Sequence, residues 1–250
     1  MAGLLGVGGG IVMVPAMAVA FDFVGLNPDV YHHVAVGTSL AVIIATGISS
    51  AKAHYQRDAV MPDVLKMWAP FIVGAALIGG LMARMYSGDV LRIIFGLVAL
   101  FVALNIVLPV QKKFMSRLGG SVQTNRISAA FIGYISALMG IGGGSLSVPT
   151  LVAFGNSMHR AVGTSAALGV LLAVPATLGF IISGWDVGGR PLLSLGYVNI
   201  PAMLVIGIMA AAMAPLGAAL AHRLNQVQLK GAFGLFLILV GARMLWQALV

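Results

Sequence analysis

Long uncharged apolar stretches follow one another along almost the whole of this 250-residue chain. A membrane-spanning helix needs about 20 mostly apolar residues to cross about 30 Å of hydrocarbon, and most of these stretches reach that length. Runs without Asp, Glu, Lys or Arg cover residues 1–21, 34–51, 67–83, 93–111, 127–158, 161–185 and 191–221, and residues 231–250 are interrupted only by Arg243. We therefore predict an all-α integral membrane protein with about eight transmembrane segments, at 1–20, 34–54, 64–86, 89–109, 126–154, 160–184, 196–222 and 227–249.

The composition excludes several classes of protein. Hydrophobic residues make up 60% of the chain and charged residues 8%, whereas soluble domains carry about 25% charged residues. The absence of cysteine excludes disulfides, thiol catalysis and cysteine-ligated metals. The acidic residues are all Asp in or beside predicted loops, so no carboxylate is placed for a proton relay at the centre of a segment. The basic residues are scattered among short loops, which does not favour nucleic-acid binding.

Two motifs occur twice, in the same order. Residues 6–15 read GVGGGIVMVP and residues 140–149 read GIGGGSLSVP, while residues 33–39 read HVAVGTS and residues 159–165 read HRAVGTS. We therefore predict two structural repeats, 1–116 and 117–250, which together form one transmembrane domain. Residues 126–139 lead into the second glycine motif, whereas only residues 1–5 precede the first, so we expect that the N-terminal lead-in of the first repeat is truncated.

The glycine motifs are the first candidate site. Three consecutive glycines, each costing about 1 kcal/mol against alanine inside a helix, should break the first and fifth segments into broken or re-entrant helices. A helix that restarts after such a break presents free N–H groups and the positive end of its dipole, which suits an anion. Close helix packing through small residues is the alternative explanation. The motif differs from a dinucleotide-binding fingerprint, since no strand precedes it. The residues of this candidate site are Gly8, Gly9, Gly10, Gly142, Gly143, Gly144 and Ser145.

The second motif adds hydroxyl groups and basic side chains. Thr38, Ser39, Thr164 and Ser165 could donate hydrogen bonds to an anion, or could instead bond back to their own helices. His33, His159 and Arg160 lie just upstream, where they could attract or bind anions at a mouth, or could be solvated residues at helix ends. Metal ligands and cofactor motifs are not indicated, so the expected partners are a small anion and the lipid bilayer. A homodimer is left open.

The sequence leaves the topology open. If every segment crosses fully, the loops after segments two, four and six carry more Lys and Arg than the opposite loops, which places them in the cytoplasm. If each glycine-broken segment instead turns back as a re-entrant hairpin, each half crosses an odd number of times and the repeats are inverted. Residues 126–154 are long enough for either arrangement.

The paired motifs and the apolar segments resemble the TauE/SafE sulfite exporter family of membrane transporters. The resemblance covers essentially the whole chain, and its motifs are residues 6–15 with 36–39 and residues 140–149 with 162–165. It implies a multi-pass protein of the bacterial inner membrane, not an enzyme, that exports sulfite or organosulfonates such as sulfoacetate. We expect a secondary transporter that works by alternating access. Transport of small carboxylates in either direction, and an anion channel, remain alternatives.

Overall fold

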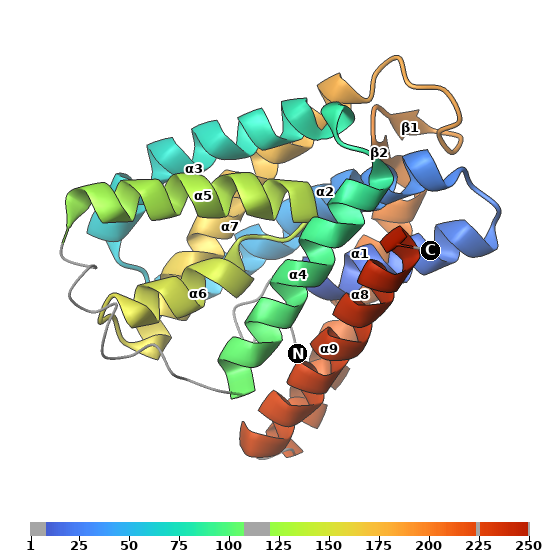
Figure 1. The fold of residues 1–250 in the computed structure, drawn as a ribbon. Helices are drawn as coiled ribbons and strands as arrows, with labels where there is room; N and C mark the ends of the chain where they lie inside the picture. The colour runs from blue at the N-terminus through green and yellow to red at the C-terminus, as the bar shows by residue number, and fades with distance from the viewer. Residues whose placement is uncertain (1–8, 108–120, 224–225, 250) are drawn as a thin grey trace.

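The computed structural model describes residues 9–107, 121–223 and 226–249, and these are almost entirely helical (Figure 1). The regular β-structure in these ranges is a short antiparallel hairpin of β1 (Ser194–Leu195) and β2 (Val198–Asn199). The helices are α1 (Gly10–Phe23), α2 (Pro28–Tyr55), α3 (Pro62–Met82), the 3-10 turn η1 (Ala83–Met85), α4 (Gly88–Val107), α5 (Val122–Met139), α6 (Gly144–Ala153), α7 (Met158–Ser183), α8 (Ile200–Arg223) and α9 (Gln226–Leu249).

Four helical stretches of the described chain are long and apolar enough to cross a membrane. They are Val30–Tyr55, Pro62–Met85, Gly88–Asn105 and Met158–Ser183. Shorter apolar helices cover Gly10–Phe23, Gly144–Ala153, Ile200–Met213 and Phe233–Leu249. The expected all-α membrane architecture is confirmed in this coarse form, while the number of eight crossings stays a prediction.

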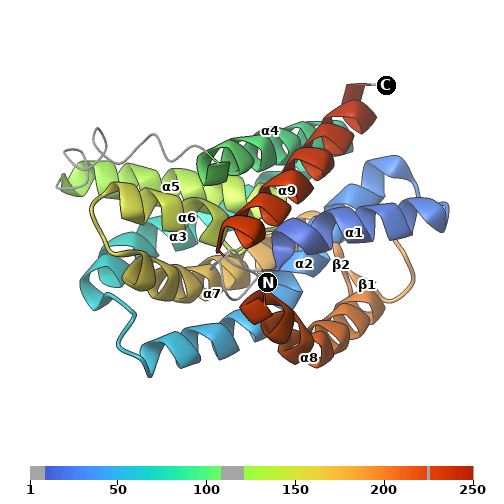
Figure 2. The same cartoon turned by 90° about the horizontal axis from the view of Figure 1, so that it is seen from below.

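The second glycine motif separates two helices. α5 ends at Met139, and the left-handed Gly140 (φ 69°) allows the N–H groups of Gly140 and Ile141 to bond back to the carbonyls of Ala137 and Ser136. These two bonds form a Schellman motif, which satisfies the carbonyls that a helix end leaves over. Gly143, also left-handed (φ 71°), then starts α6. α6 runs back alongside α5 instead of continuing its direction (Figures 1 and 2).

The first glycine motif is described only in part. α1 begins at Gly10 after Gly9, whose backbone is right-handed. Gly8 lies outside the described residues. α1 and α6 are 14 and 10 residues long, against 28 and 26 residues for α2 and α7. Each is therefore no more than half as long as the long helix that follows it.

The two long helices α2 and α7 are antiparallel. Gly47 of α2 packs against Val170 of α7. Further along the chain, Ala59 packs against Gly163, nearer the start of α7. As residue numbers increase from Gly47 to Ala59, the residue numbers of their contacts on α7 decrease, so the two chains run in opposite directions. α2 and α7 carry the equivalent HxAVGTS motifs, so the two copies point in opposite directions.

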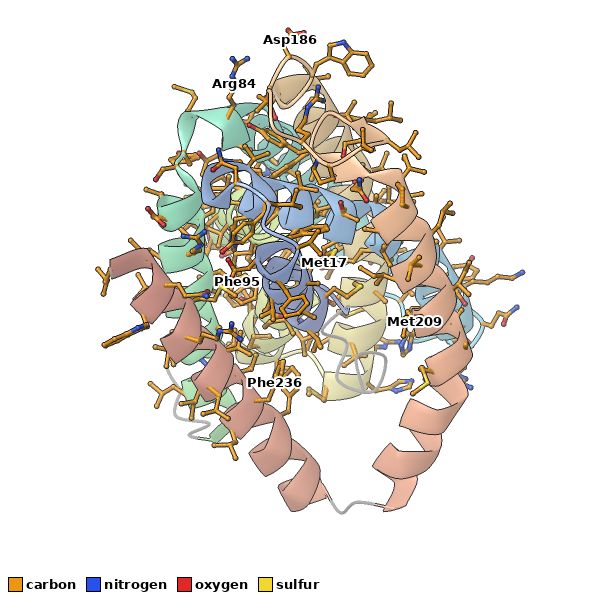
Figure 3. All side chains as sticks on the ribbon, turned by 90° about the vertical axis from the view of Figure 1, so that its right-hand side faces the viewer. Met17, Arg84, Phe95, Asp186, Met209 and Phe236 are labelled. Carbon is orange, nitrogen blue, oxygen red and sulfur yellow. The ribbon has the colours of Figure 1, made fainter. Side chains whose placement is uncertain are left out.

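Helix ends gather at two opposite faces of the bundle. Face A is defined by residues 55–62 with Val122 and Met158, and is joined by a bond from the Met61 N–H to Thr164 Oγ1 at 2.9 Å. Face B is defined by residues 28–33, 83–88 and 184–199, where the Gly37 backbone lies against the Tyr197 carbonyl. Figure 3 shows Arg84 and Asp186 together at the face B end. α1 runs from the middle of the bundle to face B, and α6 runs from the middle to face A (Figure 1).

Small residues allow the helices to cross closely, while apolar side chains cover the outside. A Cβ placed on Gly80 of α3 would lie 2.6 Å from the Ala176 carbonyl oxygen of α7, and Gly96 of α4 meets Gly241 of α9 in the same way. Such crossings are typical of membrane helices. Trp68, Phe95 and Phe180 fill the interior, with no measurable exposure. The outer side of α8 exposes a set of large apolar residues that suits contact with lipid, among them Met209 (Figure 3): Leu204, Val205, Ile208, Met209 and Met213.

Candidate functional site

The two glycine motifs meet in the middle of the bundle. Gly10, the first residue of α1, packs directly on the Gly140 carbonyl, and a Cβ placed on it would lie 2.9 Å from Ile141 Cα. A Cβ on Gly142 would lie 3.0 Å from Ile43 Cγ2 of α2, and one on Gly169 of α7 would lie 2.5 Å from the Gly142 oxygen. Ile43 and Gly169 are each near the midpoint of their helix. The motifs therefore lie at the depth of the centre of both long helices.

Two helix N-termini converge at this centre. α1 and α6 both begin there and run apart toward opposite faces. Within the described chain, the N–H groups of Gly142, Gly143 and Gly144 donate to no backbone carbonyl, and the first bonds of α6 come from Leu146 and Ser147 to the Gly143 oxygen. Each N-terminus carries the equivalent of about +0.5 elementary charge. The centre thus has positive character without a charged side chain.

Three buried serine hydroxyls lie on α5, α6 and α7, and two of them lie at the start of α6. Ser136 and Ser147 are 0% exposed and Ser165 is 1% exposed, and among the described residues none of their hydroxyls has a hydrogen-bond partner. A Cβ placed on Gly143 would lie 3.6 Å from Ser147 Oγ and 4.0 Å from Ser136 Oγ, so these two hydroxyls converge on the glycine turn. Buried polar groups without partners are rare because each costs about 1–3 kcal/mol. The two unpaired hydroxyls of Ser136 and Ser147 are therefore candidate donors to a bound ligand.

Sequence reasoning missed Ser136 and Ser147. The second glycine motif holds Ser145 and Ser147 where the first copy has Ile11 and Met13. That difference between the copies was the available signal, because polar groups inside an apolar segment point to a functional surface. Ser145 is itself buried, at 2% exposure.

The threonines of the GTS triplets hold loop backbone. Thr38 Oγ1 accepts a hydrogen bond from the Asn199 N–H at 3.0 Å, and Thr164 Oγ1 accepts one from the Met61 N–H at 2.9 Å. The glycine before each threonine packs on a nearby carbonyl, with Gly163 lying so close that an added Cβ would be 2.5 Å from the Ala59 oxygen. The two triplets therefore play the same part: Thr38 secures the chain that enters α8, and Thr164 secures the chain that enters α3. The sequence did not predict this role.

The two serines of the triplets differ. Ser39 Oγ donates to the Gly140 carbonyl at 2.7 Å and so supports the turn of the glycine motif. Ser165 has no such acceptor in the described chain. Of the four hydroxyls that the sequence proposed as ligand donors, Ser165 is therefore the one that no described protein group engages.

The basic candidates lie away from the glycine motifs. His33 is buried, and its Nε2 lies 3.1 Å from the Ala83 carbonyl oxygen and 3.0 Å from that of Tyr86, so Nε2 carries the proton and donates. The ring of His33 also stacks on Tyr197 at 4.9 Å, and burial raises the pKa of that phenol, although Arg84 and Arg190 oppose the rise.

His159 and Arg160 are exposed on face A at the start of α7. The ten-residue α6 separates this end from the glycine turn by about 15 Å. The structure thus does not bring His33, His159 or Arg160 to the convergence point.

A separate groove of about 210 Å³ lies between α1 and α9. Its walls are mainly apolar, and Figure 3 labels Phe236 on its α9 side. The lining residues are Val12, Pro15, Ala16, Val19, Phe236, Val240, Arg243 and Met244. The groove suits an acyl chain better than an anion. The described residues also include no group of three or more His, Asp or Glu that could hold a metal ion.

Comparisons with known proteins agree with the resemblance noted in the sequence. The model of the family "Sulfite exporter TauE/SafE" matches residues 1–244. A probable membrane transporter protein of Haemophilus influenzae is 34% identical over 244 residues, which covers 98% of this chain and 92% of that protein. The probable membrane transporter protein YunE of Bacillus subtilis is 27% identical, over 98% of this chain and 93% of the relative. No solved structure is a significant match. With its helices long enough to span a bilayer, the chain belongs to the TauE/SafE sulfite exporter family and is a multi-pass membrane transporter.

Proposed function

We propose that this protein is a secondary transporter that exports small sulfur-containing anions, sulfite or organosulfonates such as sulfoacetate, by alternating access. The observation that carries the proposal is the meeting of two helix N-termini at mid-depth beside buried hydroxyls without partners. The family name points to the same class of substrate. The proposed site combines the backbone of Gly9–Gly10 and Gly142–Ser145 with the side chains of Ser136, Ser147 and Ser165.

The chemistry of this site suits a sulfonate or sulfite. Such an anion offers three acceptor oxygens that share a delocalised charge, and the site offers N–H groups from one direction and hydroxyls from another. Dipoles and hydroxyls compensate the charge of the anion without an ion pair. Because no fixed opposite charge holds the anion, release remains easy, as a transporter requires. Carboxylates present two acceptor oxygens and would leave one hydroxyl unpaired.

The two halves, 1–116 and 117–250, are proposed to be inverted repeats. The antiparallel arrangement of α2 and α7 and the return of α6 alongside α5 support this topology. Inverted repeats with broken helices at their interface are the usual basis of alternating access, because each half can adopt the conformation of the other. The anion site lies between the halves, where such an exchange would open it first to one face and then to the other.

The distribution of Lys and Arg supports an orientation in which face A lies on the cytoplasmic side of a bacterial inner membrane. The described side chains at face A include Lys52, Arg57, Lys66, Arg126 and Arg160. Face B carries Arg84, Arg92 and Arg190. Lys and Arg favour the cytoplasmic side. The membrane potential would then drive an anion outward, by about 2.3 kcal/mol per charge per 100 mV, or nearly fiftyfold in concentration ratio.

Reconstitution into liposomes tests the proposal. Uptake of sulfite, sulfoacetate, taurine, lactate and sulfate is measured with and without unlabelled substrate on the opposite side. Saturable transport of sulfite or sulfoacetate that is accelerated by substrate on the trans side supports the proposal. Flux without trans-acceleration would identify a channel. Lactate transport without sulfite or sulfonate transport would identify a carboxylate carrier.

A further inference from the structure

A buried histidine on the glycine-facing side of α2 plays no part in the proposed site. His32 is 0% exposed, and in the described chain neither of its ring nitrogens has a hydrogen-bond partner. Its neighbour His33, by contrast, donates to carbonyls. Burying an imidazole without partners forfeits its hydrogen bonds to water. The fold therefore keeps a costly polar group where an apolar side chain of similar size would pack.

The position of His32 relates it to the glycine motifs. His32, Val36, Ser39 and Ile43 follow one another at helical spacing and share one face of α2. Val36 packs on Gly140, Ser39 bonds to its carbonyl, and Ile43 lies on Gly10 and Gly142. His32 is the next member of this row toward face B, about 10 Å from Ser39 along the helix axis and about 6 Å from the start of α2.

A buried arginine lies beside His32. Arg92 of α4 is 5% exposed, and its guanidinium interacts electrostatically with His32. The guanidinium also lies over the Tyr31 ring at 5.1 Å and bonds to Asp89 at 2.5 Å, whose side chain is 53% exposed and faces outward. The titratable neighbours of His32 are thus Arg92 and its partner Asp89 on α4, with Tyr31 and His33 on α2. A buried cation in a membrane segment usually marks the path of a charged solute.

We propose that His32 and Arg92 form a second anion subsite, which the transported anion occupies between the glycine motifs and face B. The neutral imidazole donates one hydrogen bond from its N–H, while the guanidinium supplies charge and further donors. Asp89, whose side chain is half-exposed, pairs with Arg92. The subsite receives the anion after it leaves the glycine motifs, so this inference rests on the proposed function. It assigns a role to His32, the residue immediately before the HVAVGTS motif of α2.

Sided kinetics test the subsite. KM for sulfite is measured from each face separately, in right-side-out and everted membrane vesicles, for His32→Phe and Arg92→Lys. The matched control is His54→Phe, at the face A end of the same helix. Loss of a hydrogen bond to a charged ligand costs about tenfold or more in affinity. We expect His32→Phe and Arg92→Lys to raise KM about tenfold when sulfite is supplied from face B, the face nearer to the subsite. KM from face A should change less than twofold, and the control should match the wild type at both faces.

An unchanged KM at both faces, or an equal rise at both, would overturn the subsite. Where His32→Phe does not fold, as judged by gel filtration, Arg92→Lys decides by the same criterion. The two proposals fail separately. Absence of anion transport by the wild-type protein refutes the proposed function. Wild-type transport that Ser147→Ala weakens but His32→Phe leaves unchanged refutes the subsite alone.

Discussion

Removing the hydroxyls at the start of α6 should make the protein more stable and less able to bind its substrate. Ser136 and Ser147 are fully buried without partners in the described chain, and an unpaired buried hydroxyl costs about 1–3 kcal/mol. Replacing either by alanine removes that cost and loses only a small packing contribution, so we expect a net gain of about 1 kcal/mol. For a chain of this size that corresponds to a rise of about 2–4 °C in melting temperature.

The effect on substrate binding has the opposite sign. A hydrogen bond to a charged ligand contributes about 1.5–3 kcal/mol, so Ser136→Ala and Ser147→Ala should each weaken sulfite binding about 10- to 150-fold. The double variant should lose less than the product of the two effects, because both hydroxyls would contact one ligand. Thermal unfolding in detergent and equilibrium binding of labelled sulfite measure the two quantities on one preparation.

Two comparison variants make this result interpretable. Ser128→Ala, two turns earlier on α5 and half-buried, should change neither quantity. Ser39→Ala removes the 2.7 Å bond to the Gly140 carbonyl and should lower the melting temperature. If Ser136→Ala and Ser147→Ala destabilise the protein, or leave sulfite affinity within twofold of wild type, the assignment of these hydroxyls to the ligand is refuted.

Four further predictions concern the fold and its orientation. Thr38→Val and Thr164→Val should each lower the free energy of unfolding by about 1–3 kcal/mol, because they leave the N–H of Asn199 or Met61 unpaired. Thr38→Ser and Thr164→Ser keep the hydroxyl and should not; thermal unfolding measures the difference, and valine variants as stable as wild type would contradict the role of these hydrogen bonds. Gly163→Ala forces a Cβ to 2.5 Å from the Ala59 oxygen and should lower the yield of folded protein, unlike Gly74→Ala, which has open space; similar yields would argue against the close crossing. Because the chain has no cysteine, Lys66→Cys and Arg84→Cys can be labelled singly in intact cells; an impermeant maleimide should react with the cysteine at 84 only, and labelling of 66 alone would reverse the orientation. Burial raises the pKa of Tyr197, so the folded state holds that proton more tightly and loses the resulting stability as pH rises above about 10; Tyr197→Phe should lessen this alkaline loss in a pH series of melting temperatures, and an unchanged loss would disprove the contribution.

Helix positions could be read from the sequence where apolar length alone determines them. The prediction for 160–184 compares with α7 at Met158–Ser183, and that for 227–249 with α9 at Gln226–Leu249. α2 was expected to begin at 34 but begins at Pro28, and both His32 and His33 are buried within it. Polar residues were expected to lie outside the helix, whereas these two histidines lie inside it.

The candidate site was predictable only in its backbone part. Consecutive glycines indicated an interrupted helix, since their conformational cost is local to the motif. The hydroxyl groups were harder, because their partners are remote: Thr38 bonds to Asn199, 161 residues away. Neither motif spacing nor side-chain type reveals such a contact. The same reason explains the omission of Ser136, which lies beside Gly143 only because α6 folds back.

The crossed tethers of Thr38 and Thr164 have a consequence for how the chain can be divided. Thr38, within residues 1–116, holds the entrance to α8, and Thr164, within residues 117–250, holds the entrance to α3, so these two stretches of chain are interlocked. Cutting the chain between them would orphan one backbone amide and one hydroxyl oxygen in each fragment. Two co-expressed fragments should therefore rebuild the transporter only by inserting in opposite senses and finding one another in the bilayer, and neither fragment should be stable by itself.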